Sequence, residues 1–176
     1  GAREWHTDHT NHKRPPKYTA LYGVKLPESG GDTGFANMQL AYDGLSDSLK
    51  ADLAKHTVVT KIEDHSYVSD ADRAKYGKPQ THPLIRTHPS TGRKALYFHP
   101  GKVRQLEGME PEESLEFLNG LLEDALKPDM TYRHKWRKGD LVIWDNRATL
   151  HVAHRDYDPA EGRIVQRILI QGEIPF

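Results

Sequence analysis

The chain has 176 residues with 25 Lys and Arg against 25 Asp and Glu, so its formal net charge is zero. Without a basic excess, neither nucleic acid nor an anionic membrane is indicated as a partner. The absence of cysteine excludes disulfide scaffolds, iron–sulfur clusters, cysteine-ligated zinc and thiol catalysis. The longest apolar runs, such as 141–144, are too short to span a bilayer, and the first residues do not resemble a signal peptide. These features predict a soluble, cytoplasmic, single-domain protein.

Strand-like and helical stretches alternate irregularly along the chain. Stretches rich in Val, Ile, Thr and Tyr predict strands at 18–24, 57–62, 83–86, 94–98, 131–134, 141–144 and 164–171. Ser90-Thr91-Gly92 predicts a hairpin between the third and fourth of these strands. Helical periodicity predicts helices over 37–45, 47–55 and 110–126. The order does not follow a βαβ pattern, so a mainly β jelly roll with flanking helices is favoured over a parallel Rossmann-type sheet.

Two of the predicted helices carry an apolar stripe. The first presents Met38, Ala41, Tyr42 and Leu45 on one face. The last presents Leu115, Leu118, Leu121, Leu122 and Leu126. Such leucines can line a groove for a partner, but a helix packed on its own sheet is the more common arrangement, so we expect a core position.

Histidines and a carboxylate provide the chemistry-bearing pattern of the chain. Among 11 histidines, His6 lies two residues before Asp8, and residues two apart in an extended stretch point to the same side. His151 follows the Trp144–Leu150 segment far downstream. Two histidines and one carboxylate form the facial triad of non-haem iron(II) oxygenases, although a His-x-Asp pair alone is weak evidence.

Further motifs accompany this triad in a fixed order. Gly30-Gly31-Asp32-Thr33 comes after the His-x-Asp segment, Trp144-Asp145-Asn146-Arg147 precedes His151, and Arg163 and Arg167 lie four residues apart in the last predicted strand. From Trp5 to Phe176 the chain resembles the TauD/TfdA family of iron(II)- and 2-oxoglutarate-dependent dioxygenases. That resemblance implies a double-stranded β-helix, the cupin-like form of the jelly roll.

The resemblance also implies a role for each of these residues. His6, Asp8 and His151 correspond to the iron ligands and form the catalytic centre. Thr33 and Arg163 correspond to the residues that bind 2-oxoglutarate, a task suited to the planar guanidinium fork. Arg167 corresponds to the arginine that meets the substrate anion, and His9 is a substrate contact or a solvated side chain. His12 is expected to be a solvated side chain, and His154 is not expected to be a ligand.

The implied function is a dioxygenase that uses Fe(II), 2-oxoglutarate and O2. It would hydroxylate a small organic anion, namely a sulfonate, sulfate ester or aryloxy or carboxylic acid, with release of succinate and CO2. Two alternatives stay open: a non-catalytic jelly-roll relative that binds ligands, and a zinc hydrolase with the same three ligands. Dependence on 2-oxoglutarate distinguishes the dioxygenase from the zinc hydrolase, because hydrolysis at zinc needs no cosubstrate.

Only five residues precede His6, whereas members of the family carry a substantial region before this ligand. Residues 1–176 are therefore expected to form a dioxygenase domain without its N-terminal part. Strands missing from the sheets would expose sheet edges and apolar surface, so this chain alone is expected to be unstable. Association into homo-oligomers is a further expectation, and the identity of the substrate is left open.

Overall fold

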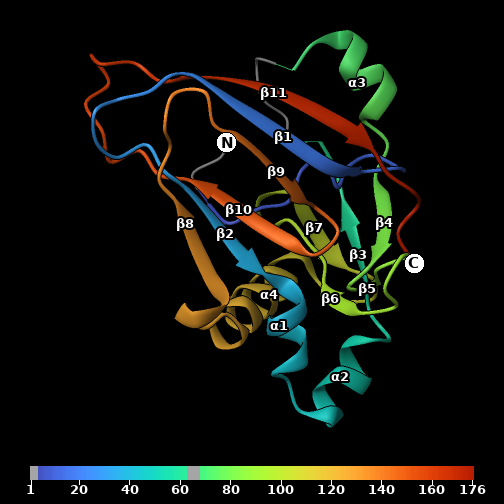
Figure 1. The fold of residues 1–176 in the computed structure, drawn as a ribbon. Helices are drawn as coiled ribbons and strands as arrows, with labels where there is room; N and C mark the ends of the chain where they lie inside the picture. Colours follow the sequence, from blue (N-terminus) through green and yellow to red (C-terminus); the bar gives the residue numbers. More distant parts are fainter. Residues whose placement is uncertain (1–3, 63–67) are drawn as a thin grey trace.

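A computed structural model describes residues 4–62 and 68–176, and its strands form three sheets of three strands and one of two. The two sheets whose strands hold the most residues are called the two larger sheets here. The first sheet places β1 (Pro16–Lys25) between β11 (Ile164–Gln171) and β9 (Leu141–Asp145), all antiparallel (Figure 1). The second places β2 (Thr33–Asn37) between β8 (Thr131–His134) and β10 (Thr149–Ala153). The chain is thus mostly β, as the sequence predicts.

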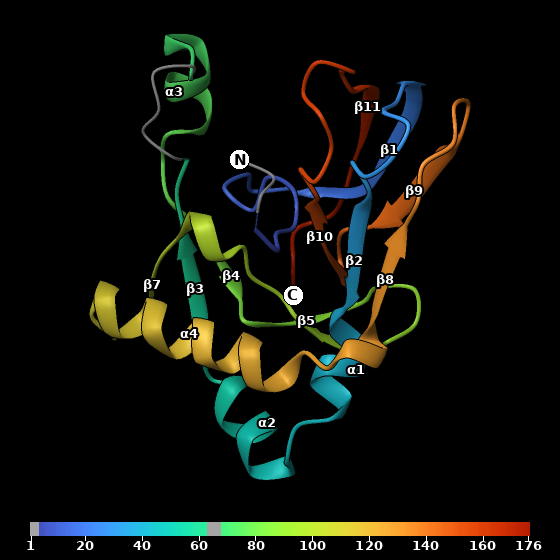
Figure 2. The same cartoon turned by 90° about the vertical axis from the view of Figure 1, so that its left-hand side faces the viewer.

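Two smaller sheets and four helices complete the described part of the chain. Strand β3 (Thr57–Thr60) pairs with β4 (Gln80–Pro83) and β7 (Val103–Leu106), and β5 (Ile85–Thr87) pairs with β6 (Lys94–Leu96). The helices are α1 (Met38–Asp43), α2 (Asp47–Leu53), α3 (Asp70–Tyr76) and α4 (Pro111–Ala125), with 3-10 turns at Pro100–Lys102 and Pro128–Met130. Helices α1, α2 and α4 gather at one end, and α3 lies at the other (Figure 2). Within the described residues no helix is long and apolar enough to cross a membrane.

The hydrophobic core lies where α1 and α4 cover the strands. Its fully buried members include Met38, Leu53, Leu96, Leu106 and Leu118. Burying a side chain of this size contributes about 1.5–3 kcal/mol. The core therefore holds α1 and α4 against the strands at the helical end of the molecule.

Each predicted strand and helix is present in the structure, but one predicted strand is divided into two. The stretch predicted as a single strand at 83–86 is split, because Leu84 donates its N–H to His56 and accepts from Tyr97. Its two halves consequently belong to different sheets, β4 and β5. The hairpin at Ser90–Gly92 joins β5 to β6, and Gly92 takes a positive φ of 70° there. Strands β2, β7 and β10 and helix α3 were not predicted.

The apolar stripe of α4 is confirmed in part. Leu118 and Leu121 are buried in the core of this chain, which supports the core position over a partner groove. Leu115 is 36% exposed, and Ser114 is buried in its place. The Ser114 hydroxyl accepts the N–H of Leu106 and donates to the carbonyl of Glu110, so a polar residue ties the helix to β7.

One face of the β11–β1–β9 sheet is apolar and open. Leu141, Ile143 and Ile168 are 60%, 57% and 65% exposed. Register pairs Ala20 with both Ile143 and Ile168, so these two side chains stand on the same face of the sheet. The opposite face of the same sheet turns Thr19, Trp144 and Arg167 toward the site described next.

Candidate metal and cosubstrate site

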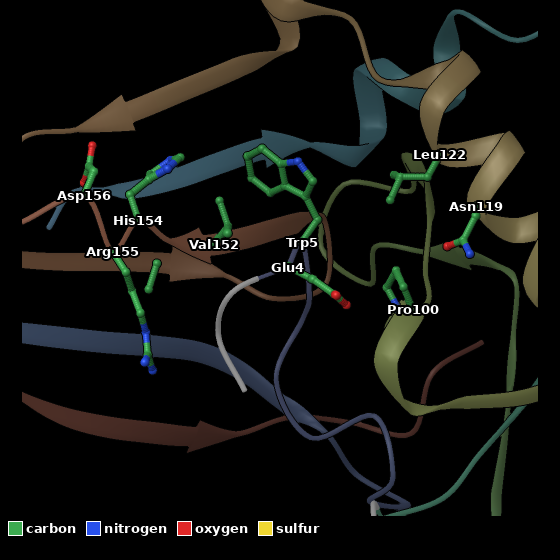
Figure 3. Close-up of a pocket in the computed structure, with 10 residues that line it drawn as sticks. Glu4, Trp5, Pro100, Asn119, Leu122, Val152, His154, Arg155 and Asp156 are labelled. Atoms are coloured by element: carbon green, nitrogen blue, oxygen red, sulfur yellow. The ribbon is translucent and has the colours of Figure 1, made fainter. Parts of the chain in front are cut away.

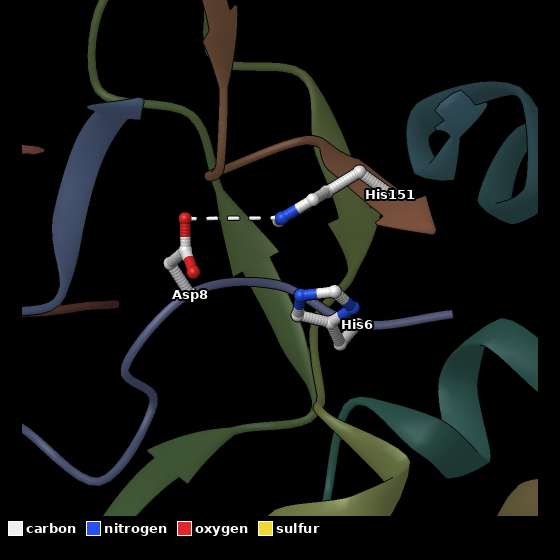
Figure 4. A group of neighbouring side chains, drawn as sticks. All are labelled: His6, Asp8 and His151. Atoms are coloured by element: carbon white, nitrogen blue, oxygen red, sulfur yellow. Dashed lines mark ion pairs between the residues drawn. The ribbon is translucent and has the colours of Figure 1, made fainter. Parts of the chain in front are cut away.

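Three potential metal ligands meet between the two larger sheets. His6 pairs with His151 of β10 through two backbone hydrogen bonds of 3.0 and 2.8 Å, which places their rings together. Asp8 reaches the same point from the loop before β1 (Figure 4). One nitrogen of each histidine and one Asp8 oxygen all lie within 4.8 Å of one another. The structure therefore brings His6, Asp8 and His151 together as the sequence predicts.

The local backbone aims the side chains of His6 and Asp8 at this point. His6 lies in an isolated β-bridge, but a turn begins at Asp8, so the extended conformation ends before it. His9, the next residue, has a φ of 48°, in the left-handed region that non-glycine residues rarely occupy. Such strain is often kept where a backbone must orient a functional group. Here the left-handed conformation of His9 turns the chain away from the site immediately after the Asp8 carboxylate.

The protonation states suit metal binding. Burial lowers the pKa of His6, and burial together with His6 lowers the pKa of His151 to about 3. Both imidazoles are neutral near pH 7, as ligands must be. Burial by itself raises the pKa of Asp8, but His151, the Thr19 hydroxyl and Arg167 outweigh it and hold that pKa below its usual value.

Hydrogen bonds orient two of the three ligands. The Nδ1 of His6 lies 2.8 Å from the carbonyl oxygen of Glu4, which leaves its Nε2 for a metal. The hydroxyl of Thr19 donates to the Oδ2 of Asp8 over 2.6 Å. The Nδ1 of His151 has no hydrogen-bond partner among the described residues. Two histidines and one carboxylate leave open positions and fit iron(II) by donor type.

The predicted cosubstrate residues lie together beside the triad. Arg163, directly before β11, donates from Nε to the carbonyl of Gly31 over 2.8 Å and from Nη2 to the Thr33 hydroxyl over 3.4 Å. The indole of Trp136 also donates to that hydroxyl, over 2.9 Å. In the described part of the chain Arg163 forms no ion pair. A half-buried guanidinium without a carboxylate partner is suited to bind an anion.

The glycine pair before Thr33 makes this arrangement possible. Gly30 and Gly31 have positive φ values of 72° and 68°. A Cβ on Gly31 would meet the side chains of Arg163 and Tyr157, each at 3.2 Å. Only glycine accommodates both the turn and the close approach of the guanidinium stem. Asp156 fixes the turn by accepting the N–H of Gly31 over 3.1 Å.

Arg167, four residues further along, faces a different partner. Its Nη1 lies 3.5 Å from the Oδ1 of Asp8, and its side chain is half exposed. Arg163 and Arg167 therefore serve separate positions, one at Thr33 and one beside the triad. His9 is half-buried, and burial lowers its pKa to about 4. His9 also lines a cavity of about 410 Å³ together with His12 and Tyr76.

A separate cavity of about 690 Å³ lies on the other side of Trp5. Figure 3 shows the Trp5 ring between the β10 side, with His154, and Leu122 of α4. None of the predicted metal or cosubstrate residues lines this cavity. His154 donates its backbone N–H to the carbonyl oxygen of Asp32 over 2.9 Å and lies outside the triad.

Several residues of the site were not predicted from the sequence. Thr19 donates to Asp8, Asn146 donates to Thr19, and Trp136 donates to Thr33. Asn146 belongs to the Trp-Asp-Asn-Arg motif, so this motif is a sequence signal that could have identified it. Thr19 and Trp136 lie in segments without a motif, so no sequence signal marks them.

Comparison with known proteins gives consistent results. Residues 1–169 match the family model described as "Taurine catabolism dioxygenase TauD, TfdA family". An alkylsulfatase of Acinetobacter baylyi is 36% identical over 98% of this chain, and a 2,4-dichlorophenoxyacetate dioxygenase of Burkholderia sp. is 37% identical over 96%. The chain spans 58% of the length of each of these two relatives.

Solved structures agree with the fold. A crystal structure of AAD-2 in complex with Mn(II) and N-oxalylglycine superposes with a TM-score of 0.88 at 32% identity. The match covers 99% of this chain and 70% of that one. The fold class predicted from the sequence is thereby confirmed as that of the jelly-roll dioxygenases.

Proposed function

This chain belongs to the TauD/TfdA family of dioxygenases, and on that premise we propose that it is an iron(II)- and 2-oxoglutarate-dependent dioxygenase. Its reaction would hydroxylate a small organic anion with release of succinate and CO2. One observation carries the proposal: His6, Asp8 and His151 converge within 4.8 Å of one another, beside the Arg163–Thr33 pair.

The donor set supports iron(II) as the metal. His6, Asp8 and His151 would hold it, and the bound metal would supply open coordination positions for 2-oxoglutarate and O2 and the oxidising power of the reaction. The neutral imidazoles and the ionised carboxylate are already in the required forms, so no proton has to leave the ligands at neutral pH.

The remaining residues of the site would bind and orient the two organic reactants. Arg163 would pair with the distal carboxylate of 2-oxoglutarate, and Thr33 would fix the guanidinium through its hydroxyl. Trp136 donates to the same hydroxyl and helps to orient it. Arg167, beside Asp8, would pair with the anionic group of the substrate, with His9 as a neighbouring contact.

The printed names of the relatives indicate the substrate range. They include an alkylsulfatase, a sulfate ester dioxygenase of Pseudomonas putida and 2,4-dichlorophenoxyacetate dioxygenases. We propose a substrate from the same range: a sulfonate, sulfate ester, or aryloxy or carboxylic acid. Residues 1–176 would form the part of the dioxygenase domain that carries the metal and cosubstrate residues. A cytoplasmic location and homo-oligomers stay predictions.

The experiment is an anaerobic titration of the iron(II)-loaded protein with 2-oxoglutarate, followed by visible absorption. A metal-to-ligand charge-transfer band is expected, and Asp8→Ala should abolish it, whereas Asp124→Ala on the exposed surface of α4 should leave it unchanged. A protein that binds iron and 2-oxoglutarate but oxidises no organic anion would instead be the non-catalytic relative. Hydrolysis that requires zinc and no 2-oxoglutarate would favour the zinc hydrolase.

A further inference from the structure

Arg133 joins two segments that lie beside the cosubstrate residues. From β8 it donates from Nε to the Oδ2 of Asp32 over 2.8 Å and from Nη2 to the Oδ2 of Asp156. Asp32 belongs to the segment directly before β2, and Asp156 belongs to the loop after β10. Asp32 is only 6% exposed, and a buried carboxylate is costly unless it is paired. One guanidinium fork therefore ties together two segments that are far apart along the chain.

Gly31 lies between Asp156 and the cosubstrate arginine. Its N–H donates to the Oδ1 of Asp156 over 3.1 Å, and its carbonyl accepts from the Nε of Arg163 over 2.8 Å. The carboxylate of Asp156 thus binds Arg133 through one oxygen and Gly31 through the other. A Cβ on Gly30 would collide with the carbonyl oxygen of Asp156, so the glycine turn packs directly on this loop. A continuous series of hydrogen bonds consequently runs from Arg133 to Arg163.

This series ends at the group that sets the orientation of Arg163. Among the described residues, the hydrogen bond to the carbonyl of Gly31 is the shorter of the two that Arg163 makes, because its Nη2 lies 3.4 Å from the Thr33 hydroxyl. A guanidinium binds a carboxylate most strongly when its plane allows two parallel hydrogen bonds. A shift of the Gly31 carbonyl would rotate that plane and weaken the pairing.

The same arginine balances negative charge near the cosubstrate residues. Asp32 acts on the Arg163 guanidinium to raise its pKa, although burial is the larger effect and lowers it. The Arg133 guanidinium and the Gly31 N–H hold the pKa of Asp156 below its usual value, so this carboxylate is ionised. Without Arg133, two carboxylates would lie unbalanced close to a site that receives an anion. Loss of orientation and loss of charge balance would therefore act in the same direction.

We propose that Arg133 is a positioning residue for the cosubstrate. It bridges Asp32 and Asp156, holds the turn at Gly31 and thereby fixes the orientation of Arg163. The inference rests on the proposed function, in which Arg163 pairs with the distal carboxylate of 2-oxoglutarate. The competing interpretation is a surface ion pair without effect on the site, because the Arg133 side chain is 44% exposed and such pairs contribute little.

The experiment compares two keto acids in anaerobic titrations of the iron(II)-loaded protein, followed by the charge-transfer band. 2-Oxoglutarate carries the distal carboxylate, and 2-oxopentanoate is the same chain without it, so only 2-oxoglutarate can pair with Arg163. In Arg133→Met we expect the Kd for 2-oxoglutarate to rise about tenfold and the Kd for 2-oxopentanoate to stay unchanged. Arg104→Met replaces an exposed arginine of β7 and should change neither value.

A conservative variant separates the bridge from charge alone. Arg133→Lys keeps the positive charge but lacks the fork that reaches both carboxylates, so we expect about a threefold rise in the Kd for 2-oxoglutarate. A Kd equal to that of the parent in Arg133→Lys would show that charge alone suffices and would overturn the bridging role.

A double variant tests the route through Asp156. If Arg133 acts through this carboxylate, Arg133→Met combined with Asp156→Asn should weaken 2-oxoglutarate no more than the more damaging single change does. Additive losses would contradict this route. Equal weakening of both keto acids in Arg133→Met, or no weakening of either, would overturn the inference while the parent still shows the band. Absence of the band in the parent would instead contradict the proposed function.

Discussion

The Thr19 hydroxyl lies 2.6 Å from the Oδ2 of Asp8 and ties strand β1 to the metal triad. Asn146 donates from Nδ2 to the same hydroxyl oxygen over 2.8 Å, and Trp144 donates to the Oδ1 of Asn146 over 3.0 Å. All four side chains are buried. The orientation of the carboxylate is therefore set by a chain of hydrogen bonds that starts in the core of the β11–β1–β9 sheet.

Replacing Thr19 tests this chain of bonds. Thr19→Val keeps the shape of the side chain but removes the donor to Asp8, and we expect iron(II) affinity to fall about 10- to 100-fold. Calorimetric titration of the apoprotein with iron(II) under anaerobic conditions measures it. Thr81→Val, at an exposed position of β4, is the matched control and should bind as the parent does. Unchanged affinity in Thr19→Val would show that Asp8 is held by other groups.

Under the proposed function, binding of 2-oxoglutarate depends on Arg163. Because no ion pair involving it occurs among the described residues, Arg163→Leu should leave the fold intact and raise the Kd for 2-oxoglutarate by about 100-fold, or about 3 kcal/mol. The charge-transfer band then requires correspondingly more 2-oxoglutarate. Arg104→Leu removes an exposed arginine from β7 and should not shift the titration. If both variants titrate like the parent, another cation binds the cosubstrate.

The short motifs predicted which residues gather at the candidate site better than the strand pattern predicted the strands that carry them. His6, Asp8, Thr33, His151 and Arg163 were all assigned from short sequence patterns, and the structure brings them together. Strands β2 and β10 were missed because each contains functional residues of a motif, which interrupt the strand pattern. The segment Thr33–Asn37 includes Gly and Ala, which have low strand propensity, and its pairing depends on neighbours far along the chain.

Other parts of the site depend on tertiary structure alone. Thr19 and Trp136 come from segments without a motif, and only folding places them beside Asp8 and Thr33. Helix α3 lacks a buried residue and so has no apolar stripe to detect. Its Ser69 cap and its acidic first turn at Asp70 and Asp72 were the available signal. Such local signals are weaker than periodicity, because caps also occur in turns.

Buried histidines make the stability of the apoprotein depend on pH. Burial lowers the pKa of His82, although its Nε2 lies 2.8 and 3.0 Å from the carbonyl oxygens of Thr10 and His12. Burial likewise lowers the pKa of His12, to about 4. The unfolded chain therefore binds more protons below about pH 6.5, so stability is complete above that pH and falls as the pH drops toward 4.

Denaturant unfolding of the apoprotein between pH 7 and pH 4 measures this dependence. Each such histidine adds at most about 1.4 kcal/mol per pH unit to the slope. His82→Gln keeps a donor for the two carbonyl oxygens but cannot titrate, so its free energy of unfolding should fall less steeply over this range. An identical slope in His82→Gln would contradict the assignment of the proton uptake to this residue.

The segment after β11 is joined to the motif before His151 by an ionic cluster. Arg86 is 1% exposed and donates from Nη2 to the Oε1 of Glu173 over 2.6 Å. Arg147 lies 3.6 Å from the other oxygen of Glu173 and also pairs with Asp145 over 2.6 Å. The guanidinium of Arg86 further lies 4.7 Å from the centre of the Tyr97 ring. Glu173 is thus the carboxylate that balances a buried guanidinium.

Removing the Glu173 carboxylate should lower the free energy of unfolding by more than removing one partner of a surface ion pair does. Glu173→Gln leaves Arg86 charged and buried, and we expect the free energy of unfolding to fall by about 2 kcal/mol, less than for a fully buried pair because Glu173 is about one-third exposed. Glu123→Gln on the exposed face of α4 should change it by less than about 0.5 kcal/mol. Adding Arg86→Met to Glu173→Gln removes the unbalanced charge, so the double variant should regain part of the loss. A double variant less stable than Glu173→Gln would show that Arg86 acts through its packing on Tyr97 rather than through its charge.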